Sequence, residues 1–245
     1  MNKYKKITWT EYYPLYKLNE HPPSTIFHKI ISKNLAKLIT FISLRIGMSP
    51  NSLTLISTGL IILAAFIIYF LEGNELSVIL FIVFTQLSYA LDCSDGVLAR
   101  ITNKGSKFGA FFDLTLDRFV ILFIYLGVGI FHYYNNILSE TFFLEYVIGF
   151  ISMGIYLQYQ LSTSFMAFIM PDMKGYLKNK KKWSFKELII KTVYEFIDTG
   201  IFYFIIGISL IFNFQFYGVI FYGIIGLLLT LSLYILLYIK NRKTT

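Results

Sequence analysis

Four aspartates lie in one short stretch, Leu91 to Arg118, of a sequence that is otherwise mostly apolar. They are Asp92, Asp95, Asp113 and Asp117. An α-helix turns by about 100° per residue, so the first pair shares one helix face and the second pair, spaced by four, shares another. A short connection containing Gly105 lies between the two segments. If it turns the chain back antiparallel, the two acidic faces meet.

A group of facing carboxylates in an apolar segment indicates a cation site. Each such charge costs roughly 3 kcal/mol or more in a membrane, and residues that carry this cost generally serve function. Carboxylates that face one another also repel unless they are protonated or bind cations. Oxygen ligands suit Mg²⁺, Mn²⁺ or Ca²⁺, and the sequence has no His or Cys cluster that would favour zinc. We therefore expect one or two divalent ions.

Small and basic residues surround the aspartates. The small ones are Gly96, Ala99 and Gly109, which share the two acidic faces and leave room for a ligand to approach the backbone. The basic ones are Arg100, Lys104 and Lys107, placed at the mouth of this space. Cationic groups beside divalent ions make a phosphate site. The combination predicts a site for a diphosphate.

The elements that must position these residues are membrane helices. The chain has 245 residues, of which 56% are hydrophobic and 15% charged, whereas about a quarter of the residues are charged in soluble domains. Uncharged runs long enough to span a bilayer are Leu53–Leu71, Val147–Met170 and Phe216–Ile239. Three more spans with charge near one end are Leu76–Leu91, Asp117–Tyr133 and Ile189–Phe212. The predicted fold is an all-α integral membrane protein with six transmembrane helices.

Lys and Arg residues alternate between the connections of these spans. Of the 22, eight precede the first span, four lie from Arg100 to Arg118, seven lie from Lys174 to Lys191 and three follow the last span. The other connections contain none. By the positive-inside rule, both termini and the aspartates are expected on the cytoplasmic side. The net charge of +8 then follows from topology and gives no support for nucleic-acid binding.

The segment before the first span divides into two parts. Residues 1–23 are expected to form a polar cytoplasmic arm, and residues 24–46 an amphipathic helix in the membrane interface, with Leu35, Leu38 and Ile42 on its apolar face. Gly47 should close this helix, while Ser49 caps the first span and Pro50 takes its first position. Residues 47–245 are then a single six-span domain.

The stretch "DCSDGVLARITNKGSKFGAFFDLTLD" resembles the signature of the CDP-alcohol phosphotransferase family at every fixed position. The "SPNSLT" opening of the first span and the six-span layout are also similar to that family. The resemblance implies that the first three aspartates hold two divalent ions, Mg²⁺ or Mn²⁺, and that Asp117, also at the metal site, is the catalytic base. It places the CDP moiety of the substrate against a set of six residues. These are Gly96, Ala99, Arg100, Gly109, Asn51 and Thr54.

Several alternatives stay open on the sequence. The donor is expected to be a CDP-diacylglycerol-type lipid whose phosphatidyl group passes to an alcohol, but a CDP-linked head group passing its phosphoalcohol to a lipid alcohol fits the same motif. Lys104, Lys107 and Arg118 are candidate phosphate or acceptor contacts. A cation transporter is the rival from another class, and it would favour acidic residues staggered at the membrane midplane. The resemblance further implies a homodimer, and we expect the plasma or inner membrane.

Overall fold

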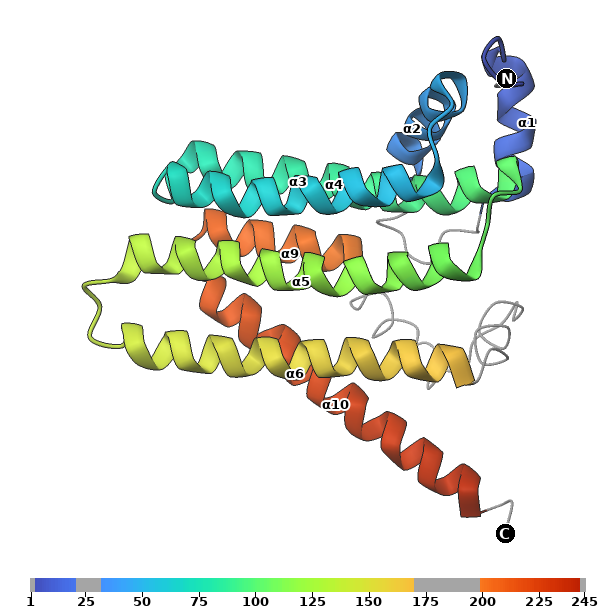
Figure 1. Ribbon diagram of the computed structural model, residues 1–245. Helices are drawn as coiled ribbons and strands as arrows, with labels where there is room; N and C mark the ends of the chain where they lie inside the picture. Colours follow the sequence, from blue (N-terminus) through green and yellow to red (C-terminus); the bar gives the residue numbers. More distant parts are fainter. Residues whose placement is uncertain (1–2, 21–31, 170–198, 243–245) are drawn as a thin grey trace, which may run out of the picture.

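The computed structural model describes residues 3–20, 32–169 and 199–242, and Figure 1 shows that these residues form a bundle of helices. Within these ranges, no residue is in a β-strand. The helices are α1 (Trp9–Asn19), α2 (Lys33–Ile46), α3 (Pro50–Phe70), α4 (Glu75–Thr102), α5 (Lys107–Asn136), α6 (Phe142–Ile169), α9 (Thr199–Ile211) and α10 (Gln215–Arg242). The predicted all-α class is confirmed for the described residues.

Three helices are long and apolar enough to cross a membrane, namely α3, α4 and α5. They contain the first three predicted spans, except that α3 ends at Phe70, one residue before the predicted end of the first span. In α6, α9 and α10 the described apolar segments are shorter, Phe142–Leu157, Thr199–Ile211 and Gln215–Leu228. The beginning of the predicted fifth span, residues 189–198, lies outside the described residues. The structure thus supports an integral membrane protein with three full-length candidate spans, and six spans stay a prediction.

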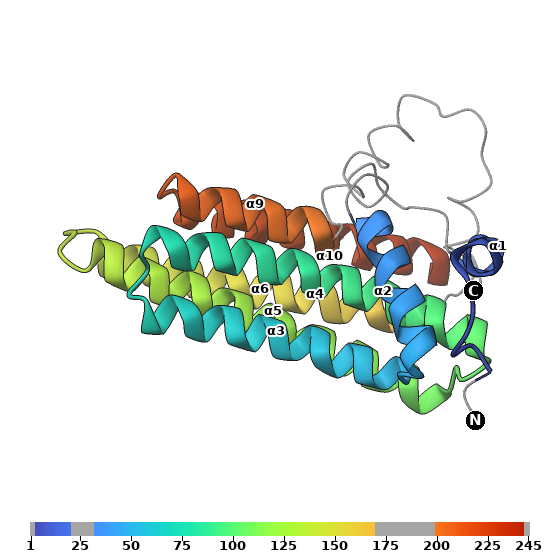
Figure 2. The same ribbon diagram turned by 90° about the horizontal axis from the view of Figure 1, so that it is seen from above.

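The long helices lie side by side, and only α10 crosses the others obliquely (Figures 1 and 2). Helix α4 packs on α3, α2 and α9, while α5 packs on α3 and α6 pairs with α10. Fully buried side chains hold the bundle together, including Ile61, Phe81, Ile124, Phe202 and Tyr222. In both views α1, α2, the α4–α5 connection and the end of α10 lie at the same end of the bundle.

Local signals set the helix ends near the aspartates. Gly47 ends α2 with a φ of 79°, and the Ser49 hydroxyl accepts a hydrogen bond from the Ser52 amide ahead of Pro50, as expected. Helix α4 ends at its C-cap residue Asn103, whose φ of 53° lies in the left-handed region. Asn is among the residues that tolerate this conformation. Ser106 then caps α5 through the Gly109 amide at 2.9 Å, so only a short connection separates the acidic faces.

The N-terminal segment contains a helix that the sequence analysis did not anticipate. Helix α1 begins with a capping box between Thr8 and Glu11, and its Tyr12 and Tyr16 are buried. In α2 (Lys33–Ile46), most of the described part of the predicted apolar face is exposed; residues 21–31 lie outside the described part. The exposed members are Leu35, Leu38 and Ile42, whereas Ile39 is half-buried against the neighbouring apolar cluster.

Close packing between α6 and α10 gives a stability prediction for Gly223→Ala. A Cβ atom at Gly223 would lie 2.9 Å from the Cα atom of Ser152, so the two backbones would have to separate. We expect the free energy of unfolding to fall by about 1–3 kcal/mol, measured as a lower melting temperature in detergent. The matched control is Gly154→Ala in α6, where nothing lies within 4 Å of the added atom. Equal melting temperatures for the two variants would contradict the packing.

Candidate active site

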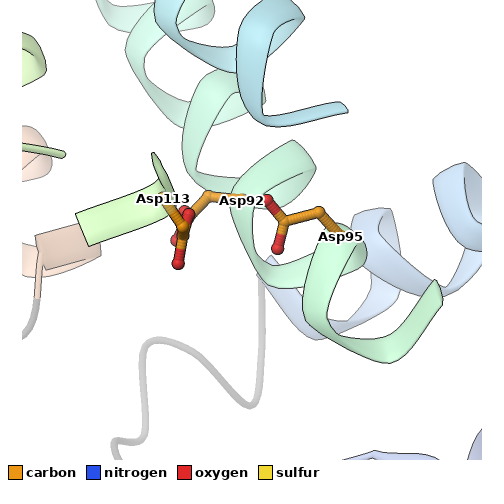
Figure 3. A group of neighbouring side chains, drawn as sticks. All are labelled: Asp92, Asp95 and Asp113. Atoms are coloured by element: carbon orange, nitrogen blue, oxygen red, sulfur yellow. The ribbon is translucent and has the colours of Figure 1, made fainter. Parts of the chain in front are cut away.

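Three of the four aspartates converge at the end of the bundle that carries the α4–α5 connection. One carboxylate oxygen from each of Asp92, Asp95 and Asp113 lies within 4.8 Å of the others. Figure 3 shows the Asp92 and Asp113 side chains meeting between α4 and α5, with Asp95 one turn further along α4. The antiparallel turn expected from the sequence therefore brings the two acidic faces together.

These three side chains fit a hard divalent ion. For a metal–oxygen distance of about 2 Å, two ligand oxygens on one Mg²⁺ lie up to about 4 Å apart, so small side-chain rotations would complete the coordination. Asp113 Oδ1 is buried and accepts no hydrogen bond among the described residues. An orphaned buried carboxylate oxygen needs a cation or a proton to offset its desolvation. The donor set, oxygen only, matches Mg²⁺ or Mn²⁺.

Asp117 lies near this cluster without being one of its three members. It follows Asp113 by one helical turn, and its charge interacts with those of Asp92, Asp95 and Asp113. Arg118, the next residue, interacts with both Asp117 and Asp113. The structure thus separates three converging carboxylates from a fourth that interacts with them electrostatically and precedes an arginine. Their metal and base roles stay predictions.

The start of α3 completes one side of the site. Thr54 Oγ1 donates a hydrogen bond of 2.5 Å to Asp95 Oδ2. Asn51 lies against the start of α5, because its Oδ1 is 3.2 Å from the position that a Cβ atom would take on Gly109. The sequence suggested Asn51 and Thr54 only through the family resemblance, since their spacing gives no signal of its own. The fold now places both beside residues of the motif.

The hydroxyl of Thr54 gives a prediction about metal affinity. Residues that hydrogen-bond to metal ligands commonly change affinity by 10–100-fold when removed. We expect Thr54→Val to weaken Mn²⁺ binding by about tenfold, measured by isothermal titration calorimetry of the protein in detergent. Thr54→Ser should retain most of the affinity. Thr58→Val is the matched control, because the Thr58 hydroxyl donates to the Thr54 carbonyl oxygen in its own helix. Equal affinity in Thr54→Val and wild type would remove Thr54 from the site.

The remaining candidate pocket residues surround the end of α4. The Nη1 and Nη2 atoms of Arg100 lie 3.4 and 3.8 Å from the position of a Cβ atom on Gly96, so the guanidinium group covers this glycine. Ala99 is half-buried on the same helix end. Lys104 and Lys107 are exposed at the connection. The basic rim predicted from the sequence is therefore present at the end of α4 and the start of α5.

One contact of the site escaped the sequence analysis. Arg100 Nε donates a hydrogen bond of 2.7 Å to the main-chain carbonyl oxygen of Asn19, at the end of α1. Every residue has a main-chain carbonyl group, so the residue type at position 19 does not predict this hydrogen bond. The only available signal was the Thr8-x-x-Glu11 pattern, which is typical of a helix N-terminus and would have placed a helix before this point.

Comparison with known proteins gives one family match and several relatives. The family model described as CDP-alcohol phosphatidyltransferase matches residues 47–234. The chain is 38% identical over 100 residues to the archaetidylinositol phosphate synthase of Pyrococcus horikoshii, which covers 41% of the chain and 46% of that relative. It is 37% identical over 90 residues to the phosphatidylinositol phosphate synthase of Corynebacterium glutamicum, covering 37% of each. These alignments span less than half of either relative.

Proposed function

Because the chain belongs to the CDP-alcohol phosphatidyltransferase family, we propose that it transfers a phosphatidyl group from a CDP-diacylglycerol-type donor to an alcohol and releases CMP. The observation that carries the proposal is the convergence of Asp92, Asp95 and Asp113 within 4.8 Å, at the end of two apolar helices. A donor lipid can stay in the bilayer while its diphosphate reaches this site. The product would be a phosphodiester lipid.

Different residues of the site are assigned to metal binding, phosphate binding and nucleotide binding. Asp92, Asp95 and Asp113 would hold Mg²⁺ or Mn²⁺, which when bound supplies Lewis-acid polarisation of the phosphoryl group and neutralises charge on the departing CMP. Thr54 orients Asp95 through its hydrogen bond. Arg100, with Lys104 and Lys107 at the rim, binds the donor phosphates. We assign the nucleotide to the small residues of the motif, where it would approach the backbone, with Asn51 beside Gly109. The small residues are Gly96, Ala99 and Gly109.

Asp117 is the group that we assign as general base. The acceptor hydroxyl oxygen forms a bond to the phosphorus of the phosphatidyl group, the bond from that phosphorus to the CMP oxygen breaks, and the hydroxyl proton passes to Asp117. This carboxylate lies one helical turn after Asp113 and interacts electrostatically with it. Arg118 beside Asp117 would bind a negatively charged acceptor or hold this aspartate in place.

Inositol phosphate is the first candidate for the acceptor. Two relatives are named as synthases of an inositol phosphate lipid, which puts inositol phosphate first among the candidates. Against a phosphorylated acceptor, the segment Val147–Phe168 contains no Lys or Arg, so Arg118 and Lys191 would have to provide the positive charge. Transfer of a phosphoalcohol from a CDP-linked head group to a lipid alcohol is the alternative that the same site allows.

The surroundings of the enzyme follow from the charge pattern. We place the active site at the cytoplasmic face of the plasma or inner membrane, with both termini on the same side, because Lys and Arg collect there. The clustering of the aspartates at one end of two adjacent helices argues against a cation transporter, which would need acidic groups near the midplane. A homodimer is proposed from the family resemblance.

The test is CMP release by the purified protein with Mg²⁺ or Mn²⁺. CDP-diacylglycerol would be offered with inositol phosphate, inositol, glycerol 3-phosphate and serine in turn. CDP-choline and CDP-ethanolamine with diacylglycerol would test the opposite arrangement. CMP that depends on one acceptor establishes the reaction and identifies the alcohol. If no pairing releases CMP from protein that binds Mn²⁺, the proposed function is wrong for these substrates.

A further inference from the structure

Helix α1 contacts the candidate nucleotide pocket from outside the part of the chain that the family model covers. The match begins at residue 47, whereas α1 comprises Trp9–Asn19. The contact is the hydrogen bond from Arg100 Nε to the Asn19 carbonyl oxygen, 2.7 Å long and linking positions 81 residues apart. The N-terminal helix therefore touches the arginine that the proposed function assigns to the donor phosphates.

Several buried contacts fix α1 in this position. Tyr12 and Tyr16 are 0% and 2% exposed, and their hydroxyl groups donate to the main-chain oxygens of Lys37 and Lys33 in α2, at 2.8 and 3.4 Å. Glu20, just after α1, forms an ion pair of 3.0 Å with Lys33. Two large side chains with almost no exposure bury more than an accidental surface contact would. Helix α1 is thus a packed part of the fold.

A second attachment joins the N-terminal segment to the helix that carries Arg100. The Tyr4 hydroxyl donates a hydrogen bond of 3.0 Å to the carbonyl oxygen of Ile101. The same cluster of buried apolar side chains includes Tyr12 and Tyr16 from α1 and Val97, Leu98 and Ile101 from α4. The end of α4 is therefore packed against the N-terminal segment close to Arg100 in the sequence.

The contact uses one edge of the guanidinium group. The last carbonyl groups of a helix lack partners within that helix and carry partial negative charge, so a cation near them is favoured. The Nε atom of Arg100 is held by such a carbonyl, while Nη1 and Nη2 lie over Gly96. Charge attraction to Asp95 acts on the same group. An arginine fixed by Nε can present its Nη groups to a phosphate without first losing side-chain entropy.

We propose that α1 is a positioning element that holds the Arg100 guanidinium in the orientation needed to bind the diphosphate of the CDP-linked donor. This inference rests on the proposed function, because it concerns the same pocket. A competing arrangement predicts the opposite change in KM for the donor. If the docked helix holds Arg100 where the nucleotide must lie, loosening α1 would improve donor binding. The direction of the change in KM for the donor separates the two.

The experiment loosens α1 in the full-length chain and measures kinetics with each substrate varied. Tyr16→Ala removes a buried ring of α1 from the apolar cluster that includes Val97, Leu98 and Ile101 of α4. We expect KM for the CDP-linked donor to rise about tenfold, as for loss of a hydrogen bond to a charged group. The kcat value and KM for the acceptor should change less than about twofold. Tyr16→Phe keeps the ring and should restore wild-type KM. The matched control is Leu18→Ala, because Leu18 is also in α1 but is 83% exposed.

The same substitution in an Arg100→Ala variant shows whether Tyr16→Ala changes KM for the donor through Arg100. Arg100→Ala should itself raise KM for the donor, and adding Tyr16→Ala should then change it no further, because the group that α1 positions is gone. A merely structural role would give effects that multiply. If Tyr16→Ala does not fold, Tyr4→Phe tests the same point without creating a cavity, with a smaller rise in KM.

The outcomes distinguish this inference from the proposed function. No CMP release by the wild-type protein defeats the proposed function itself. If the wild type is active, the inference is overturned when Tyr16→Ala, or Tyr4→Phe in its place, leaves KM for the donor unchanged or lowers it. It is also overturned when the effect of that variant on KM multiplies with the effect of Arg100→Ala. A rise in KM for the donor alone that disappears in the Arg100→Ala background supports it.

Discussion

Asp117→Asn is expected to bind Mn²⁺ and the CDP-linked donor with near wild-type affinity while its turnover falls by about 10²–10⁴-fold, the range for loss of a general base. The amide is nearly the same size as the carboxylate but cannot accept the proton of the acceptor hydroxyl. Asp117 is not one of the three side chains whose oxygens converge within 4.8 Å. Removing its charge should therefore reduce kcat much more than metal binding.

The measurement combines CMP release under saturating substrates with Mn²⁺ titration of the same preparation. Thr115→Val on the same helix is the control, because the Thr115 hydroxyl donates to the Phe111 carbonyl oxygen within α5 and has no assigned role. Wild-type turnover in Asp117→Asn would exclude Asp117 as the base. Loss of Mn²⁺ binding together with turnover would instead make Asp117 a metal ligand.

The meeting of the acidic faces could be predicted from the sequence because it depends on short-range rules. Helical periodicity places Asp92 and Asp95 on one face, and the short connection after α4 leaves room only for an antiparallel return. The Gly47, Ser49 and Pro50 signals are equally local, and the structure has all three as expected. Gly105 lies in the connection between α4 and α5, as expected, and the residue with positive φ there is Asn103.

The role of the N-terminal segment could not be predicted in the same way. Residues 1–23 have a polar composition, and Pro14 within the segment argues against a helix. What makes α1 stable is burial of Tyr12 and Tyr16 against α2 and α4, and such burial depends on helices that are distant in the sequence. Periodicity identifies an apolar face only when that face is made of aliphatic residues, and tyrosines with polar tips do not contribute clearly to it.

The sequence does not predict the hydrogen bonds of the site that join side chains to main-chain atoms or to residues on distant helices. The bond from Thr54 to Asp95 joins positions 41 residues apart, and the bond from Arg100 ends on a carbonyl group that every residue has. Neither spacing nor residue type encodes these pairings. The family resemblance supplied Thr54, whereas Asn19 precedes the matched region and had no such support.

Asp113→Asn is expected to abolish activity and metal binding while making the metal-free protein more stable. Asp113 supplies one of three converging oxygens, and Mg²⁺ and Mn²⁺ bind amide oxygens less strongly than carboxylates. Without metal, this carboxylate faces other carboxylates, and its buried Oδ1 has no hydrogen bond among the described residues. Replacing it by a neutral amide removes like-charge repulsion and lowers the desolvation cost, worth about 1 kcal/mol.

The two effects produce melting temperatures that cross when metal is added. In EDTA, Asp113→Asn should melt above wild type. In saturating Mn²⁺, wild type should gain stability, because an ion that binds only the folded state shifts unfolding by mass action, whereas the variant should gain little. Glu140→Gln, at an exposed carboxylate in the α5–α6 connection, makes the same chemical change and should shift neither value. A variant that melts below wild type in EDTA would show that the Asp113 carboxylate is stabilised by partners in the metal-free fold. This reversal of the order of melting temperatures would show that the acidic cluster destabilises the metal-free protein and stabilises it only when metal binds. If the cluster served stability alone, Asp113→Asn would melt below wild type in both conditions.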